Sequence, residues 1–355
     1  MKKFIFLVFF LLILILFIFS QEIIENPNKP LNPNAGRILE LKEVLRISDE
    51  GEEFFFKRPQ FPKVAENGFI FLHDSNQFLK FTPEGQFVKN LLKKGQGPGE
   101  IQQFSRYVLQ GEDIYIFDIG NSKILHMDLE GELLDEFRLT ERYSLLLGLL
   151  GDHFVMTKTN FPEAEERTGN FIDAPEYIVV LSKDEEVIKK FPSAVMRAYR
   201  GENVMVSWGR SITIMSHDGR HCIWTDPEEY MVTVLNIKTG EVVSKFTRQY
   251  SRVKAPERET AKPGSKIPKR KYLSDITYIY TFQGNILVWT STFDEKKGML
   301  FDLFDKKGTF LDSFWLNVKG TLIGTHEGFL FFRESNEDGT MDLTKYQVVD
   351  EKWKY

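Results

Sequence analysis

FIFLHDSNQFLKFTPEG at residues 69–85 and YIFDIGNSKILHMDLEG at residues 115–131 align without a gap, about 46 residues apart. Each consists of a short apolar run, a polar turn, a second apolar run and a turn that ends in glycine. Short apolar runs bounded by turn residues predict β-strands. A repeat of this length lies in the range of propellers and other arrays of repeated units.

The glycine turn and the strand after it recur farther along the chain. They return as Gly240-EVVSKF and Gly308-TFLDSF, and without the glycine as Glu185-EVIKKF. The whole pattern occurs at least five times between Phe69 and Tyr346. Because an open sheet edge invites aggregation and radial closure removes it, the repeats predict an all-β, six-bladed β-propeller with four-stranded antiparallel blades.

The first five blades can each be given four strands, and the sixth only three. The expected ranges are 61–65, 69–73, 77–81 and 86–91; 107–110, 114–118, 123–128 and 132–139; 144–150, 153–158, 177–182 and 186–191; 211–216, 220–225, 230–237 and 241–246; 275–282, 285–290, 299–304 and 309–316; and 320–325, 329–333 and 344–349. RILELKEVLRI at 37–47 is a strand without a blade, and we expect it to close the ring as the fourth strand of the sixth blade. EKWKY at 351–355 is the alternative for that place.

Composition limits the classes of function. The 355 residues carry a formal charge of −5, so no broad positive surface supports nucleic-acid binding, and we expect no nucleic-acid partner. Aromatic residues make up 14% of the chain, which favours strands. Cys222 is the single cysteine, which excludes an internal disulfide and a cysteine-based zinc cluster. In the apolar run HCIW it is expected to be a small buried hydrophobe.

The N-terminus has the pattern of an export signal. Lys2 and Lys3 precede an apolar run at 4–19, and the small residue Ser20 follows it. We expect 1–20 to be a signal peptide, 21–36 a Pro/Asn-rich linker and 37–355 the propeller. The protein is therefore predicted to be exported to the periplasm or the extracellular space. An uncleaved N-terminal membrane anchor is the alternative, since the run is short for a membrane span.

The predicted turns and insertions separate onto two rims of the ring. The turns between the first and second strands of a blade, and between the third and fourth, are all tight. The insertions at 93–104, 159–176, 192–210 and 248–274 fall instead between the second and third strands or between blades. Long loops are often functional, and insertions gathered on one face often mark a binding face. We expect that rim to bind a ligand or a partner.

Two segments carry a resemblance to a known family. In Asp118-IGNSKILHMDLEG an Asn follows the Asp by three residues, and an apolar-x-x-apolar-Asp run and a glycine turn come next. Lys94-GQGPGEIQQF has a Gly-x-Gly-Pro-Gly-Glu connection. Together they make the chain similar to the NHL-like six-bladed β-propellers of exported bacterial proteins. The resemblance implies a binding scaffold, although some related propellers are lyases, lactonases or esterases with a metal in the central channel.

Three polar residues near the loop-bearing rim are candidates for ligand or calcium binding. Asp74 and Asp118 end the second strands of their blades, and Asn121 lies in the NHL-like run. Carboxylate and amide oxygens suit calcium. Asp and Asn in turns also bond their own backbone, and this structural alternative remains open for all three.

Two apparent motifs do not predict a nucleotide-binding site or a metal site. The glycines at 95, 97 and 99 lack the strand–helix context of dinucleotide motifs and the Gly-Lys-Ser/Thr of phosphate loops, so they predict a tight connection between blades with positive φ angles. The six histidines stand at different positions of the repeat, and we expect no convergent metal site from them. No Gly-x-Ser-x-Gly elbow is present.

Basic and aromatic residues on the same rim are further candidates. The connection 248–274 is rich in Lys and Arg and includes Arg252, Lys269 and Arg270, which could bind an acidic partner or simply form a solvated linker. Trp208 with Arg210 and Arg106 in or beside connections between blades would suit a sugar or a peptide. Packing between blades is the alternative for Trp208.

The sequence as a whole predicts a binding protein that recognises a protein or glycan in the cell envelope on its loop-bearing rim. We expect a monomer without a cofactor, with a divalent ion such as calcium in the channel as a further option. Contact with the membrane is expected only through the N-terminal segment. The alternative is a propeller hydrolase or lyase, similar to lactonases or esterases, with a metal in the central channel.

Overall fold

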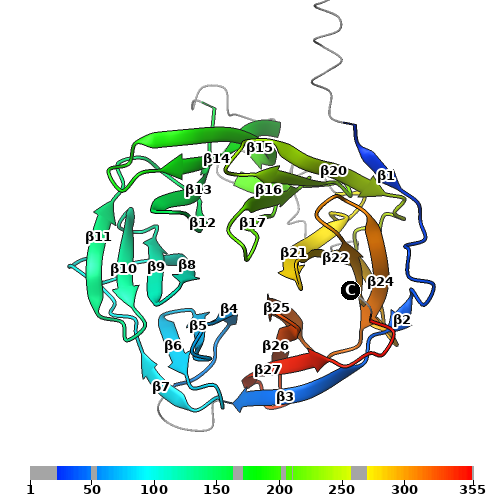
Figure 1. Cartoon of the computed structure of the whole chain (residues 1–355), viewed down its shortest axis with the longest axis horizontal. Helices are drawn as coiled ribbons and strands as arrows, with labels where there is room; N and C mark the ends of the chain where they lie inside the picture. Colours follow the sequence, from blue (N-terminus) through cyan, green and yellow to red (C-terminus); the bar gives the residue numbers. More distant parts are fainter. Residues whose placement is uncertain are drawn as a thin grey trace, which may run out of the picture.

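In the computed structural model the chain forms a ring of six antiparallel sheets around a central axis (Figure 1). The structure describes residues 22–48, 54–162, 171–200, 205–209, 211–256 and 270–353, with 205–209 described by backbone alone. All regular elements of these residues are strands. The all-β, six-bladed propeller predicted from the repeats is confirmed. No helix in these ranges is long and apolar enough to cross a membrane.

The first three blades follow the chain from the inside of the ring outward. The first is β4 (Pro59–Val64), β5 (Ile70–Asp74), β6 (Gln77–Phe81) and β7 (Phe87–Asn90); the second is β8 (Phe104–Gln110), β9 (Asp113–Asp118), β10 (Lys123–Asp128) and β11 (Leu133–Arg138); the third is β12 (Leu145–Leu150), β13 (His153–Thr159), β14 (Phe171–Leu181), β15 (Val187–Arg200) and β16 (Met205–Gly209).

The other three blades each contain a strand from the N-terminal segment. The fourth is β17 (Thr213–Met215), β18 (His221–Thr225), β19 (Val232–Asn236), β20 (Val242–Arg248) and β1 (Ile24–Asn26); the fifth is β21 (Ile276–Phe282), β22 (Asn285–Asp294), β23 (Gly298–Phe304), β24 (Phe310–Leu316) and β2 (Arg37–Ile38); the sixth is β25 (Thr321–His326), β26 (Phe329–Ser335), β27 (Met341–Val348) and β3 (Leu41–Ser48).

The ring closes because a strand from the N-terminal part of the chain joins the last blade. β3 pairs antiparallel with β27 from Leu41↔Val348 to Ser48↔Asp342, so the N-terminal strand completes the sixth blade as predicted. Arg46 stabilises the closure through ion pairs to Asp342 at 2.7 Å and Glu334 at 3.0 Å.

The segment before β3 differs from the expected linker. Residues 22–38 lie along the outside of the fourth and fifth blades, where β1 and β2 add parallel to β20 and β24 (Figure 1). The reason lies in the asparagines that suggested a linker. Asn26 donates to the carbonyl of Gly308 at 2.8 Å, and Asn32 donates to the carboxylate of Asp312 at 3.0 Å. Both asparagines are buried.

Packing against the neighbouring blade explains the recurrent glycine. Gly131 and Gly308 have φ angles of +78° and +87°, and a Cβ on either would lie 2.8 Å from Leu91 or Phe246 of the preceding blade. Glycine meets both requirements at once. In the third blade Glu185 takes this place at φ +63°, and its carboxylate accepts a hydrogen bond from the Thr140 amide at 2.7 Å.

The third blade also departs from the expected strand boundaries. β14 and β15 stay paired well beyond the end of β13, and β16 adds a fifth strand, so parts of the insertions 159–176 and 192–210 are sheet rather than loop. Pro175 and Pro192 argue against strands, because proline cannot donate to a ladder. The structure accommodates them with a bulge between Pro175 and Tyr177.

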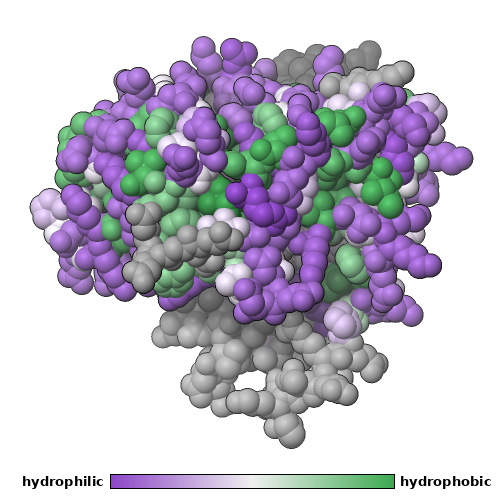
Figure 2. Space-filling model, turned by 90° about the horizontal axis from the view of Figure 1, so that it is seen from below, coloured by the Kyte–Doolittle hydropathy of each residue, from purple (hydrophilic) through white to green (hydrophobic). Residues whose placement is uncertain are grey.

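The hydrophobic core consists of six clusters, and each one is shared by two adjacent blades. Phe71 and Phe78 of the first blade, for example, pack with Ile116 and Leu125 of the second. Cys222 is fully buried in such a cluster, and burial raises the pKa of its thiol to about 12, as expected for a small hydrophobe. Figure 2 shows the outer wall as mainly hydrophilic with apolar side chains between the charges.

Antiparallel pairing gives the ring two different rims. The tight turns, such as the one at Gly111 and the one at Gly131, lie on what we call the turn rim. The connections between second and third strands and between blades lie on the opposite side, the loop rim. Each innermost strand therefore begins at the loop rim and ends at the turn rim.

Candidate functional site: the central channel and its mouth

The central channel is surrounded by the innermost strands β4, β8, β12, β17, β21 and β25 (Figure 1). In five of these six strands the pairing with the next strand shifts register at a bulge. A bulge re-aims the side chains around it. The residues that face the channel are therefore not those that a simple period of two along the strand would select.

A cavity of about 880 Å³ opens at the loop-rim end of the channel. The first residues of five innermost strands line it, together with parts of the connections before them. The lining includes Gln60, Phe61, Gln103, Phe104, Ser105, Arg106, Ser144, Ser211, Thr213, Arg270, Thr277, Tyr278 and Ser291. We call this cavity the mouth. It combines aromatic rings, hydroxyl groups, amides and guanidinium groups, and its described lining residues include no carboxylate.

A narrower section of about 240 Å³ continues inward from the mouth. Phe61, Arg106 and Tyr278 line both spaces, while Lys63, Tyr280, His217 and His326 line only the inner one. We call it the inner channel. None of its lining residues carries a carboxylate either.

Arg106 connects the mouth with the inner channel. It follows the bulge in β8, and its guanidinium lies over the ring of Phe61 at 4.6 Å. It donates to the hydroxyl of Tyr278 at 3.3 Å. Its buried Nε has no partner among the described residues. The guanidinium thus has one hydrogen bond and one aromatic contact, and within the described part of the chain it has no carboxylate.

Lys63 is the second cation of the inner channel, and it was not among the residues predicted for the site. The bulge between Gln60 and Lys63 and the positive φ of Phe61 set its direction. Its ammonium lies 5.7 Å from the centre of the Tyr107 ring. Burial, and then the charge of Arg106, lower the pKa of Lys63 from 10.5 to about 8.

Two histidines lie near each other at the turn-rim end. The rings of His217 and His326, both from turns between first and second strands, are 6.5 Å apart. Burial lowers the pKa of both, and the charge of Lys63 adds to the shift of His217. Within the described ranges no three His, Cys, Asp or Glu side chains gather as a metal site would require.

Asp74 and Asp118 hold the connections between blades. Asp74 is fully buried and accepts hydrogen bonds from the amides of Lys57 and Arg58, both at 2.7 Å. Asp118 is buried in the same way and accepts from the amides of Gln102 at 2.9 Å and Gln103 at 2.8 Å. These bonds support the structural alternative that the sequence left open.

Asn121 belongs to the same arrangement. Its side-chain amide donates to Asp118 at 2.7 Å and to the carbonyl of Gly95 at 3.2 Å. The glycine-rich connection folds around Glu100, which accepts from the amide of Gly97 at 2.9 Å. Of its three glycines only Gly99 has a positive φ, so the expected connection is present with one left-handed residue. The amides of Gly97 and Gly99 donate hydrogen bonds to the protein's own carboxylates, those of Glu100 and Glu136.

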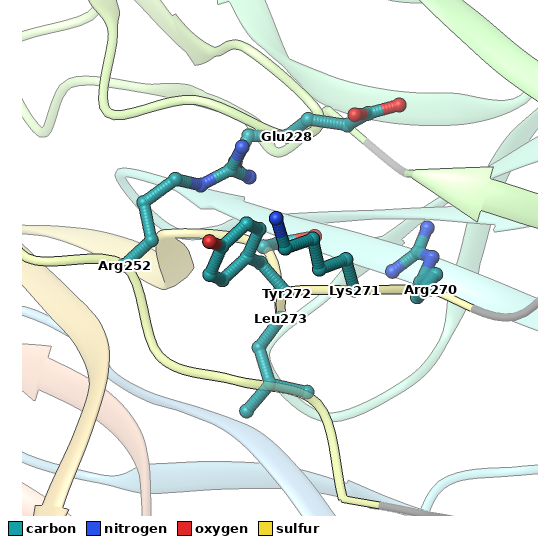
Figure 3. A pocket seen from close by; sticks show the side chains of 7 residues that line it. Glu228, Arg252, Arg270, Lys271, Tyr272 and Leu273 are labelled. Carbon is teal, nitrogen blue, oxygen red and sulfur yellow. Dashed lines mark hydrogen bonds between the residues drawn. The ribbon is translucent and has the colours of Figure 1, made fainter.

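Arg252 and Arg270 lie at the base of the long basic connection, around a small pocket of about 100 Å³ (Figure 3). Arg252 forms an ion pair with Asp275 at 2.9 Å, and its guanidinium lies 5.0 Å from the centre of the Tyr272 ring. An isolated antiparallel β-bridge between Lys254 and Tyr272 joins the two ends of the connection. Arg252 therefore fixes this base, while Arg270 also lines the mouth.

The structure brings together only part of the predicted set. Arg106 and Arg270 line the same cavity, and Asp74, Asp118, Asn121 and Arg252 do not line it. Arg210, Lys269 and the side chain of Trp208 lie outside the described residues. Lys63 and Tyr278 join the site, and the sequence had not indicated them.

Comparison with known proteins places the architecture in a family. A family described as 6-bladed beta-propeller matches residues 52–318. A solved structure named as an exported protein from Bacteroides fragilis is similar, with a TM-score of 0.60 and 18% identity over 92% of this chain and 99% of that one. A member of the DUF4221 family from Bacteroides vulgatus has a TM-score of 0.54 and 11% identity over 88% and 99%. At these identities the likeness concerns the fold alone. No curated protein sequence matches the chain.

Proposed function

The chain belongs to the six-bladed β-propeller family, and on that premise we propose that it is an exported binding protein whose loop rim recognises a ligand or protein partner in the cell envelope. The mouth of the central channel is the place where we expect recognition to occur. Arg106 and Arg270 are the proposed contacts from the predicted set, and we add Lys63 and Tyr278.

One observation carries this proposal: five blades contribute to a single cavity at the loop rim. Its volume of about 880 Å³ lies in the range of small-molecule sites. The surrounding sheets hold the base of the cavity rigidly, because every blade shares a hydrophobic cluster with each of its neighbours. A rigid scaffold with variable loops is the usual arrangement of binding proteins.

Export rests on the N-terminal pattern of Lys2, Lys3 and the apolar run that follows. We propose a periplasmic or extracellular location, with membrane contact only through the N-terminal segment if it is retained. We also propose a monomer without a bound cofactor, whose partner is a protein or a glycan rather than a nucleic acid. A relationship of the first two blades to NHL repeats is part of the same proposal.

A hydrolase or lyase with a divalent metal in the channel is less well supported. Lys63 and Arg106 carry positive charge into the inner channel, and no lining residue there offers a carboxylate. Divalent cations prefer oxygen ligands with negative charge. This donor set would repel such an ion.

Blocking one rim at a time tests the proposed function. We expect Ser105→Trp, at the mouth, to reduce binding to immobilised envelope glycans and photo-crosslinking to envelope proteins by at least tenfold. The matched control is Glu112→Trp, an exposed residue of the turn rim, which should leave both unchanged. Loss of binding in the control with retention in Ser105→Trp would overturn the assignment of the loop rim.

A further inference from the structure

We propose that the inner channel binds the anionic group of a small organic anion, a carboxylate or a phosphate, between Lys63 and Arg106. This inference rests on the proposed function and specifies the chemistry of its ligand. It specifies that the ligand carries a negative charge, which is bound in the inner channel, while the rest of the ligand lies in the mouth.

Two positive charges face the inner channel. Lys63 and Arg106 come from adjacent innermost strands, β4 and β8, and line the same narrow space. Their charges are close enough for Arg106 to disfavour the protonated form of Lys63. Like charges that share a partly desolvated site destabilise each other unless an opposite charge lies between them.

None of the described residues that line the inner channel provides that opposite charge. The titratable or charged lining residues are Lys63, Arg106, His217, Tyr278, Tyr280 and His326. Asp218, the neighbour of His217, already forms an ion pair with Lys306 at 2.6 Å. Glu327 lines an adjoining space at the turn-rim end that shares His217 and His326 with the inner channel, and its charge acts on His326.

Two other cations in the molecule differ from Lys63 and Arg106 because each is paired with a carboxylate. The buried Lys123 forms an ion pair with Glu136 at 2.8 Å, and the buried Arg248 forms one with Asp302 at 2.8 Å. Buried charges in proteins are ordinarily paired in this way. Lys63 and Arg106 form no such pair within the described part of the chain, and Arg106 keeps a buried, unpartnered Nε.

The dimensions and donors favour an oxyanion on a compact body. A guanidinium and an ammonium together can hold a carboxylate or phosphate with charge-assisted hydrogen bonds. The hydroxyl of Tyr278 adds a third polar group beside Arg106 at 3.3 Å. Above it, the rings of Phe61 and Phe104 and the hydroxyls of Ser105, Ser144 and Ser211 line the mouth, where the body of the ligand would lie.

Protonation of Lys63 gives the site a pH signature. Its pKa of about 8 means that the ammonium loses its proton above this pH in the free protein. A bound anion favours the protonated form, so affinity should fall as pH rises above about 8, by up to tenfold per unit. His217 and His326 have lowered pKa values and are neutral throughout this range.

The test is calorimetric titration of the purified full-length protein in chloride-free buffer. The probes are benzoate, glucuronate, phenyl phosphate and glucose 6-phosphate, each beside its neutral counterpart: benzamide, glucose or phenol. We expect at least one anion to bind tenfold or more tightly than its neutral counterpart. The carboxylate and phosphate arms identify which oxyanion the site prefers.

Variants then locate the binding. Lys63→Met and Arg106→Gln should each weaken anion binding at least tenfold, and Lys63→Met should abolish the decline above pH 8. The exposed residues Lys42 and Arg138 provide the matched controls Lys42→Met and Arg138→Gln, which should change nothing. Circular dichroism of all four variants verifies the fold.

The outcomes separate the two proposals. If no anion binds better than its neutral counterpart, or if Lys63→Met leaves anion affinity unchanged, the anion site is overturned. The proposed function survives that result if Ser105→Trp still removes binding of an envelope glycan or protein. If Ser105→Trp also has no effect, the proposed function fails as well.

Discussion

The buried carboxylates at the ends of the second strands and the half-buried cations of the inner channel make an instructive contrast. Asp118 accepts hydrogen bonds from the amides of Gln102 and Gln103 and from the side chain of Asn121. Lys63 lies deep in the channel beside another cation, with no acid among the residues that line it. Both residues lie in strands of the repeated blades. Of the two, only the side chain of Asp118 has hydrogen-bond partners among the described residues.

The difference separates a structural charge from a candidate functional one. A buried charge with a complete set of partners stabilises the connection that it holds. A buried charge without partners costs stability, and folds tend to retain such costs where a ligand can offset them. The following changes test whether Asp118 and Lys63 fall on opposite sides of this division.

The largest effect should come from Asp118→Ala. Its removal leaves several part-buried backbone amides, including those of Gln102 and Gln103, without this acceptor, and we expect the free energy of unfolding to fall by about 3 kcal/mol. Urea denaturation measures it. The matched control is Asp184→Ala, at an exposed turn, which should stay within about 0.5 kcal/mol of the unmodified protein. An equally small effect of Asp118→Ala would contradict its structural role.

Lys63→Met should have a smaller effect of opposite sign. Because it removes an unpartnered charge beside Arg106 while keeping most of the side-chain volume, we expect the free energy of unfolding at pH 7 to rise by about 1 kcal/mol. The same denaturation measurement applies. A loss of stability as large as that of Asp118→Ala would mean that Lys63 has a structural partner after all.

The pH dependence of that difference sharpens the comparison. The pKa of Lys63 is lowered in the folded protein to about 8 from 10.5. Between these values the unfolded chain binds more protons than the folded one, so the free energy of unfolding rises with pH. The stability advantage of Lys63→Met should therefore shrink from pH 8 to pH 10.5. A constant difference across this window would show that the pKa of Lys63 is not lowered.

Arg252→Gln should have the smallest effect. Its ion pair with Asp275 is partly exposed, with 34% of the Arg252 side chain accessible. We expect a loss of less than about 1 kcal/mol, since such pairs contribute little. Anion binding in the inner channel should not change. A tenfold loss of anion affinity would place the site at the base of the basic connection instead.

Much of the fold was predictable because it depends on local sequence. The glycine turns require both a positive φ and close contact with the preceding blade, and these demands recur at Gly85, Gly131, Gly240 and Gly308. The closing strand was predictable because the sixth blade lacked one. The course of residues 22–38 was not, because β1 and β2 are short additions to sheet edges within a Pro/Asn-rich stretch.

The site was harder to predict for a different physical reason. The sequence predicted a site on the loop rim and selected Arg106, which lines the mouth, but bulges in β4 and β8 change which side chains face the channel. Lys63 and Tyr278 therefore could not be assigned to it from alternation. Asp74 and Asp118 were chosen for their chemistry, and only their hydrogen bonds reveal that they hold the connections between blades.

Diffraction from crystals soaked in bromide tests the central claim most directly, because the anomalous signal locates the anion without any assumption about the natural ligand. We predict a bromide in the inner channel, in contact with the Lys63 ammonium and the Arg106 guanidinium, that is absent from crystals of Lys63→Met. Bromide found only on the outer surface, with the channel of the unmodified protein free of it, would contradict the account.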